Sequence, residues 1–223
     1  ITDLPDGAWH GEDWTHNDCF EDIATPVRVA VTISGDGVHV DFEGTGPQMR
    51  GFKNSSAANT QSAVYMAIKS FFDAPLPHNE GVFRPITIAM PEGSAVNPRP
   101  PAPTSNGTIA IAQHIIHAVW QALGQADPDL ACAGWGRSVH PTMSGHTPET
   151  DHRYIVFHFQ TMPGGGALKG RDGFASVGHL SSLGGLTIPN IEPYEQLYPI
   201  TFERQELRCD GGGPGTFRGG PGI

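Results

Sequence analysis

The first clear pattern in the sequence is an alternation of apolar and polar residues between positions 26 and 43. Apolar side chains occupy every second position before and after the segment Ser34-Gly35-Asp36-Gly37; they are Val27, Val29, Val31, Ile33, Val38, Val40 and Phe42. A period of two places these side chains on one face of a strand, and a short glycine-containing segment is typical of a hairpin turn. We therefore expect a β-hairpin with one buried face.

Two later segments have the three-to-four-residue spacing of amphipathic helices. The first covers about residues 60–72, with Thr60 as its expected cap and Pro75 after its end; its apolar stripe is Val64, Ala67, Ile68, Phe71 and Phe72. The second begins near Asn106 and ends near Gln125, with a stripe of Ile109, Ala112, Ile116, Val119, Trp120 and Leu123. Such stripes predict helices that pack one face against a sheet.

The remaining segments predict short strands joined by long loops. Strands are expected at residues 87–90, 154–160 and 202–207. The proline-rich segment 91–103 should form an ordered extended connector, and a loop is expected from the glycine run 164–166 to about Pro199. The sequence thus predicts an α+β fold, mixed, strand-rich and loop-rich, with two main amphipathic helices packed on a sheet. Residues 1–223 can form one sizeable core, so we expect a single domain.

Composition changes this picture mainly by excluding classes of partner. With 29 glycines and 20 prolines, the chain has many loop-forming positions. The formal net charge of −10, with only 13 Lys and Arg, argues against a nucleic-acid or anionic-membrane surface. No apolar run approaches the ~20 residues needed to span a bilayer. Cys19, Cys132 and Cys209 lack the paired spacing of a disulfide framework or zinc knuckle, which favours a cytoplasmic location.

Histidine is the residue type that most invites a catalytic or metal-binding hypothesis, because the chain contains 11 of them. His114 and His117 share a face of the second predicted helix, but no acidic residue close in sequence completes a metal site. Histidines on a partly buried helix often form only hydrogen bonds. The candidate catalytic residues are His158, in the predicted strand 154–160, and His179, in a loop. For each of them the alternative is a packed histidine without a catalytic role.

Two glycine-containing turns are the candidate substrate-binding segments. Bare backbone amides can bind an oxyanion or carboxylate, and such amides are expected at Ser105, Asn106, Gly107, Gly164, Gly165 and Gly166. The alternative is that these glycines only permit tight turns. The segment 165–172 has the glycine spacing of a phosphate-binding loop but lacks the required Lys and Ser/Thr, so a P-loop is excluded. The sequence contains no dinucleotide-binding, zincin or α/β-hydrolase motif.

Several blocks follow one another along the chain in a recognisable order. They are LPDG near the start, DFEGTGPQMRG, a helix ending in FFD, FRPITIAMPEGSAVNPRPPAP, the glycine run, and RQELRCDGGGPGTFRGGPG. In content and order these blocks resemble the hydantoinase B family. Family members are considerably longer, so the resemblance implies that residues 1–223 are the C-terminal part of such a subunit.

The resemblance implies an enzyme subunit that works with an ATP-binding partner. In this family a hydantoinase A-like subunit uses ATP and Mg to phosphorylate the substrate, and the B subunit hydrolyses or carboxylates the activated small molecule. The family's divalent metal, Zn or Mn, and its ligands are expected in the N-terminal part of the subunit. No metal ligand is therefore assigned within this sequence.

The blocks do not separate the reactions of this family. Hydrolysis of a cyclic amide such as a hydantoin, a lactam or 5-oxoproline is the first expectation, and ATP-dependent, biotin-independent carboxylation of acetone or acetophenone is the second. The segment 178–199 departs from the Thr/Asn-rich pattern associated with the family, which puts a hydantoin substrate in doubt and leaves room for an apolar ketone. A non-catalytic scaffold piece of such a complex, or a metalloenzyme built from the histidines alone, are the remaining alternatives.

Overall fold

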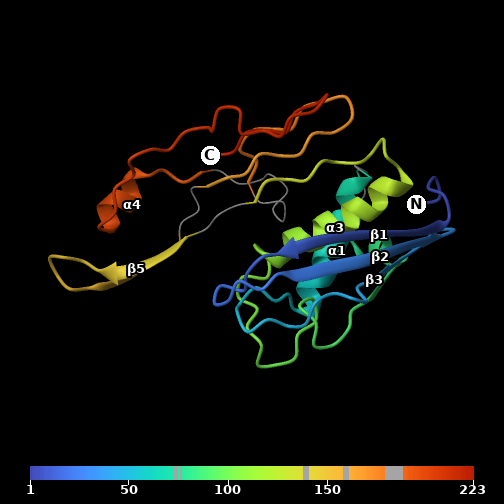
Figure 1. Ribbon diagram of the computed structural model, residues 1–223, viewed down its shortest axis with the longest axis horizontal. Helices are drawn as coiled ribbons and strands as arrows, with labels where there is room; N and C mark the ends of the chain where they lie inside the picture. Colours follow the sequence, from blue (N-terminus) through green and yellow to red (C-terminus); the bar gives the residue numbers. More distant parts are fainter. Residues whose placement is uncertain (73–74, 76, 138–140, 158–160, 179–187) are drawn as a thin grey trace. The chain divides into compact units, whose positions relative to one another are not determined.

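The computed structural model describes residues 1–72, 75, 77–137, 141–157, 161–178 and 188–223 (Figure 1). Its elements follow the order β1, β2, β3, α1, α2, β4, α3, β5, β6 and α4. The chain divides into two compact units, Ile1–Cys132 and Ala133–Ile223. This division does not test the single-domain expectation, since two compact units can still unfold as one cooperative domain. That expectation stays a prediction.

A four-stranded sheet with the order β1-β2-β3-β4 lies at the centre of the first unit. Its strands are β1 (Gly7–Thr15), β2 (Thr25–Ser34), β3 (Gly37–Asp41) and β4 (Ile86–Ala89). The first three are antiparallel neighbours, whereas β4 runs parallel to β3. All seven apolar residues of the predicted hairpin are buried, and Val27, Val31, Val40 and Phe42 are fully enclosed. The predicted hairpin with one buried face is confirmed.

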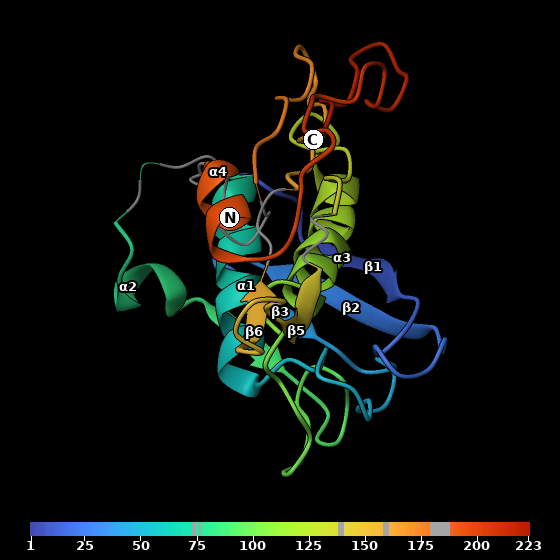
Figure 2. The ribbon, with the colours of Figure 1, turned by 90° about the vertical axis from the view of Figure 1, so that its left-hand side faces the viewer.

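Two long helices, α1 (Ala57–Phe71) and α3 (Ile111–Ala126), pack on this sheet (Figures 1 and 2). α3 is buried along most of its length and contacts β1 and β2. α1 lies beside α3, where the indole Nε1 of Trp120 donates to the carbonyl oxygen of Ala67 at 2.9 Å. Both predicted helices and the α+β fold are confirmed, although α3 begins at Ile111 and not near Asn106 as expected. In the residues described, no helix combines the length and apolar composition that crossing a membrane requires.

The start of α1 differs from the sequence expectation. Ser56 caps the helix, because its side chain accepts a hydrogen bond from the N–H of Asn59, so Thr60 as the expected cap is wrong. The Thr60 hydroxyl lies within the helix and donates to the carbonyl oxygen of Val96 at 2.7 Å. The cap therefore lies about one turn before the expected position, and Thr60 instead links α1 to the proline-rich segment.

The proline-rich segment 91–103 is ordered, as expected, but tightly turned instead of extended. The N–H of Gly93 donates to the carbonyl oxygen of Asn97, and the N–H of Ser94 donates to that of Pro91. A short helix, α2 (Glu80–Phe83), precedes β4 and this segment. Since proline supplies no backbone donor, the prolines prevent β4 from continuing into a longer strand.

The strand β1 is absent from the sequence expectation, because its residues are polar or aromatic on both faces. α3 approaches it very closely: a Cβ atom built on Gly11 would lie 1.9 Å from the carbonyl oxygen of Ala118. Real Cβ atoms cannot come so near to a backbone oxygen. Gly11 therefore lets the main chains of β1 and α3 pack directly against each other.

Two glutamines of α3 bind the backbone of β1 beside this contact. The side-chain oxygen of Gln121 accepts from the N–H of Glu12 at 3.1 Å, and Nε2 of Gln125 donates to the carbonyl oxygen of His10 at 2.7 Å. These hydrogen bonds satisfy backbone groups on the side of β1 that has no neighbouring strand. The register of α3 along β1 is thus fixed on both sides of Gly11.

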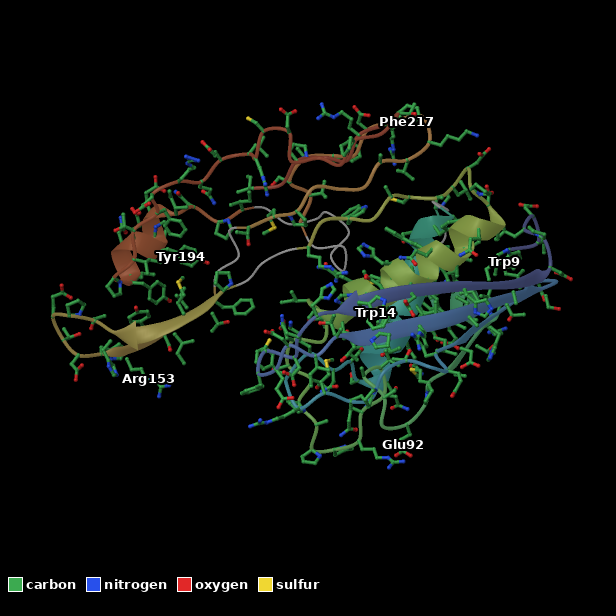
Figure 3. All side chains as sticks on the ribbon, in the orientation of Figure 1. Trp9, Trp14, Glu92, Arg153, Tyr194 and Phe217 are labelled. Carbon is green, nitrogen blue, oxygen red and sulfur yellow. The ribbon has the colours of Figure 1, made fainter. Side chains whose placement is uncertain are left out.

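The second unit contains the hairpin β5 (Thr142–His146) and β6 (Arg153–Phe157), the short helix α4 (Glu192–Leu197) and glycine-rich loops (Figure 3). The rings of Tyr154 and Tyr198 lie 5.7 Å apart and connect β6 to the end of α4. The expected strand at 154–160 is confirmed as far as Phe157. α4 falls within the region expected to be a loop, which corrects that expectation.

The expected last strand at residues 202–207 is wrong. These residues have no regular secondary structure and are mostly exposed. The N–H of Phe202 donates to the side-chain oxygen of Glu195 at 2.7 Å instead of joining a ladder. A strand is stable only beside a partner strand, and none pairs with this segment in the described part of the chain.

Replacing Gly11 by alanine is expected to lower the free energy of unfolding by about 1–3 kcal/mol, because α3 must move away from β1 to admit the methyl group. Urea unfolding followed by circular dichroism measures the change. Gly37→Ala is the control, since a Cβ there meets nothing closer than 3.5 Å. Equal stability of the Gly11 variant and the wild type would contradict the direct main-chain contact.

Asp18 fixes the loop that follows β1. Its Oδ1 accepts from the N–H groups of Phe20 and Glu21 at 2.8 Å each, and its Oδ2 accepts from the N–H of Gly51 at 2.9 Å. The hydrogen bonds from Glu21 and Phe20, followed by that from Gly51 and by the charge of Arg50, hold the pKa of Asp18 below its usual value. The ionised carboxylate is thus the form that this loop binds.

A lowered pKa in the folded state predicts a stability contribution that is present above the unfolded pKa of about 3.9 and is lost as the pH falls through the folded pKa. We expect Asp18→Asn to be less stable than the wild type at pH 7 and the gap to narrow below about pH 4. Melting temperatures across pH 2–8 measure this. A gap that stays constant over that range would contradict the role of the Asp18 charge.

Candidate functional site

Two buried histidines of α3 and a half-buried aspartate of β1 form a cluster in the first unit, which we call the Asp13 cluster. The Nδ1 atoms of His114 and His117 each lie 3.2 Å from Oδ2 of Asp13. The side chains of the two histidines are only 6% and 9% exposed, and that of Asp13 is 18% exposed. One carboxylate oxygen therefore contacts two imidazoles in a largely dry environment.

The fold brings these residues together through the close contact at Gly11. Side chains two apart on a strand share a face, so Asp13 points toward the helices as Gly11 does. Residues three apart on a helix also share a face, which places His114 and His117 side by side. α3 lies against β1 along this stretch, so the two histidines meet the carboxylate.

The geometry of the Asp13 cluster indicates which of its groups donate hydrogen bonds and which accept them. A carboxylate oxygen only accepts hydrogen bonds, so His117 donates to Asp13 through Nδ1–H and its Nε2 is left as an acceptor. The other oxygen of Asp13 accepts from the N–H of Trp14 at 2.8 Å, which fixes the carboxylate. Such carboxylate–imidazole pairs orient the ring and fix its tautomer. Chemically, the cluster can hold or transfer a proton.

Asp13 is the partner that the sequence analysis missed, because the search for an acidic residue stayed close to His114 and His117. The contact spans 104 positions along the chain. Reading residues 7–15 as a strand would have supplied the signal, because it puts Asp13 on the same face as Gly11. Within the described residues, no group of three or more His, Cys, Asp or Glu is arranged to hold a metal ion.

The candidate segment Ser105, Asn106 and Gly107 precedes α3 as a series of turns. The N–H of Asn106 donates to the carbonyl oxygen of Phe52, and that of Gly107 donates to the carbonyl oxygen of Thr104. Two of the three expected amides are therefore occupied by the protein itself. The third residue, Ser105, is exposed. A substrate-binding role for the segment stays a prediction.

The buried side chain of Asn54 holds this segment against the loop before α1. Its Nδ2 lies within hydrogen-bond distance of the carbonyl oxygens of Met49, Gly51 and Pro103, and its Oδ1 accepts from the N–H of Met49. A Cβ on Gly107 would come within 2.7 Å of the Asn54 carbonyl oxygen. Glycine at 107 is thus required by a close backbone approach.

The glycine run Gly164, Gly165 and Gly166 is buried in the second unit and packs against the C-terminal residues. The N–H of Gly165 donates to the carbonyl oxygen of Phe174, and the carbonyl oxygen of Gly165 accepts from the N–H of Gly220. A Cβ on Gly164 would lie 1.8 Å from the carbonyl oxygen of Gly220. The glycine-rich tail is therefore an ordered, tightly packed loop.

A cavity of about 450 Å³ lies beside this packed tail, entirely within the second unit. It is lined by Gly134, Trp135, Gly136, Arg137, Thr161, Met162, Pro163, Gly164, Gly165, Arg208, Gly211, Gly213, Gly219, Gly220, Gly222 and Ile223. Two of the predicted substrate-binding glycines, Gly164 and Gly165, are in its wall. The candidate catalytic residues His158 and His179 lie outside the described residues, so their roles stay predictions.

The profile of the family described as Hydantoinase B/oxoprolinase matches residues 1–223, the whole chain. The chain therefore belongs to the hydantoinase B/oxoprolinase family, and the family resemblance of the sequence blocks is confirmed. The solved structures that match this chain include an ATP-dependent caprolactamase and an acetone carboxylase.

Caprolactamase subunit beta from Pseudomonas jessenii is 35% identical over 230 residues, which cover 100% of this chain and 39% of that protein. The crystal structure of the ATP-dependent caprolactamase from the same organism matches with a TM-score of 0.86 at 34% identity, over 99% of this chain and 38% of that one. A nucleotide-free acetone carboxylase structure matches with a TM-score of 0.81 over 98% of this chain and 31% of that one. Its 18% identity supports the fold alone.

We expect Asp13→Asn to lower the free energy of unfolding by about 1–3 kcal/mol. Whichever way the amide faces, its NH2 donor meets either the two histidines or the N–H of Trp14, where the carboxylate accepts at both oxygens. The nitrogen chemical shifts of His117 should also move from the Nδ1-protonated tautomer toward a mixture. Asp36→Asn, at an exposed turn of the same unit, is the control. Unchanged stability and unchanged nitrogen shifts would contradict the described contact.

Proposed function

We propose that the chain forms part of the B subunit of an ATP-dependent enzyme that hydrolyses a cyclic amide. The observation that carries this proposal is the 35% identity to caprolactamase subunit beta over the whole chain, together with the TM-score of 0.86 to the caprolactamase structure. The chain spans about two fifths of that relative, so the substrate and partners of the whole protein belong to the proposal.

In the proposed reaction, a hydantoinase A-like partner subunit binds ATP and Mg and phosphorylates the amide oxygen of the substrate. Phosphorylation makes the carbonyl carbon electrophilic, so water adds to it, and the ring C–N bond breaks as the nitrogen takes up a proton. A second water releases the phosphate from the resulting acyl phosphate and leaves the ring-opened carboxylate. The chain itself supplies the fold of the B subunit around the small-molecule substrate. This division fits the absence of a P-loop motif from the sequence.

The divalent metal, Zn or Mn, belongs in this proposal to the N-terminal part of the B subunit. The described residues of this chain offer no group of three or more metal-ligating side chains. We therefore derive no step of the reaction through a metal held by them. His158 and His179 are the proposed catalytic residues of the chain, as a general base or acid toward the activated substrate.

Carboxylation of a ketone is the second candidate function. It is supported by the TM-score of 0.81 to acetone carboxylase, but at 18% identity this likeness concerns the fold alone. Cyclic-amide hydrolysis ranks first because its relative is nearly twice as similar in sequence. A scaffold without catalytic residues is the third candidate. It differs from both enzymes because substitution of His158 or His179 would leave the turnover number of the complex unchanged.

The test uses the full-length subunit that contains this sequence, copurified with the hydantoinase A-like subunit encoded in the same genome. We expect ADP release that depends on a cyclic amide and matches the amount of ring-opened product, with caprolactam, 5-oxoproline and hydantoin as trial substrates. Fixation of labelled bicarbonate with acetone or acetophenone, without ring opening, would instead support the carboxylase.

Substitution of His158 and His179 separates an enzyme from a scaffold. We expect each alanine variant to lower the turnover number by about 10²–10⁴-fold if the residue transfers a proton. His152→Ala, an exposed histidine of the same unit, is the control. Unchanged turnover in both variants, with the complex intact by gel filtration, would favour the scaffold.

A further inference from the structure

The cavity in the second unit has walls made mostly of main chain. A Cβ on Gly220 would lie 1.9 Å from the carbonyl oxygen of Phe174, and one on Gly212 would lie 1.8 Å from that of Gly219. With the contact of Gly164 and Gly220 described above, glycines are required where these segments cross. The lining of the cavity consequently offers backbone polar groups at close range to any occupant.

One of these backbone groups lacks a partner. Gly164 is buried and lines the cavity, yet its N–H donates to no acceptor in the described parts of the chain. The neighbouring amides of Gly165 and Gly220 are both bonded internally. Because buried N–H groups are nearly always paired, an unpaired one beside a cavity indicates a position for an acceptor atom.

The side chains around the cavity carry positive charge only. Arg137 and Arg208 are in its lining, and no Asp or Glu is among the described lining residues, although the chain as a whole has a net charge of −10. Nearby, Arg218 is neutralised by Asp210 at 3.1 Å. Arg208 has no acidic partner among the residues that the structure describes.

The lining also includes apolar side chains, among them Trp135, Met162 and Ile223. A volume of about 450 Å³ falls within the range of small-molecule sites, which combine apolar walls with a few polar groups. A ligand that matches both the positively charged and the apolar parts of the lining has an anionic group at one end and an apolar carbon chain. Guanidinium groups match the geometry of carboxylate and phosphate oxygens.

We propose that this cavity binds the oxyanion of a small organic molecule, a carboxylate or a phosphate ester, with Arg208 and the N–H of Gly164 as its main contacts. Oxyanion binding follows from the cavity alone. That the anion is a product or intermediate of cyclic-amide hydrolysis rests on the proposed function, because ring opening of a lactam yields a carboxylate.

The binding test uses the full-length subunit without ATP, so that no turnover takes place. Isothermal titration calorimetry with 6-aminohexanoate, with 6-aminohexanamide as its uncharged counterpart, and with inorganic phosphate measures Kd. We expect the carboxylate to bind at least about tenfold more tightly than the amide, and Arg208→Gln to raise its Kd by about tenfold or more. A stronger response to phosphate would assign the site to a phosphate group.

Arg204→Gln is the matched control, because Arg204 is an exposed arginine of the same unit that pairs with Glu206 and is absent from the cavity lining. Its Kd should stay within about twofold of the wild type. Should Arg208→Gln fail to fold, protection of Arg208 from phenylglyoxal by 6-aminohexanoate in the wild type gives the same answer by mass spectrometry.

Two results would overturn the inference. They are equal affinity for the acid and its amide, and labelling of Arg208 that is unchanged by every anion tested. Each result can be distinguished from a failure of the proposed function, since ring opening can be assayed in the same preparation. Intact hydrolysis without anion binding would reject the cavity assignment alone, whereas anion binding without hydrolysis would reject the proposed reaction alone.

Discussion

Where α3 crosses β1, main chain meets main chain, because glycine at position 11 leaves no side chain between them. This direct contact sets the distance between α3 and the sheet. The glutamine bonds to β1, the burial of the apolar stripe of α3 and the meeting of Asp13 with two histidines all require the same distance. A larger residue at this point would disturb all three together, since they share one rigid helix.

In the second unit, glycines likewise permit close main-chain packing, but between loops instead of between a helix and a strand. Its glycines lie where backbone segments cross, as at Gly164 and Gly220, and their hydrogen bonds tie the C-terminal residues to the rest of the unit. At these crossings glycine is therefore explained by packing, and not by a need for mobility. The cavity follows from this packing, because the glycines in its walls leave room between the segments.

The sequence predicts those elements whose signal is local. Alternation in residues 26–43 reflects one buried face. The apolar positions from Ile109 to Leu123 keep a helical spacing although α3 is buried on all sides from Ile111 to Trp120, so β2, β3 and α3 could be found without a structure. β1 could not, because it contributes Asp13 to one face and Glu12 to the other and shows no apolar alternation. Residues 202–207 mislead because two apolar residues, Phe202 and Leu207, enclose a polar run that pairs with no strand in the described part of the chain.

The same division holds for the candidate sites. The sequence identified His114, His117, Gly164 and Gly165 as residues that could bind or catalyse. It did not identify Asp13 or Arg208 as their neighbours, because these come from distant segments. The family was identified from blocks of sequence that turn out to be structural: the segment around Pro91 is a set of turns, and the final glycines are packing contacts. Their identity reflects backbone geometry that few other residues permit.

The glutamine bonds along β1 have a further consequence for association. An edge strand normally offers unpaired N–H and C=O groups to any extended peptide, which invites strand addition and aggregation. Gln121 and Gln125 occupy that edge in the way that a fifth strand would, and α3 covers it. Growth of this sheet by β-augmentation is consequently directed to its opposite edge, at β4, where a further strand would extend the parallel side.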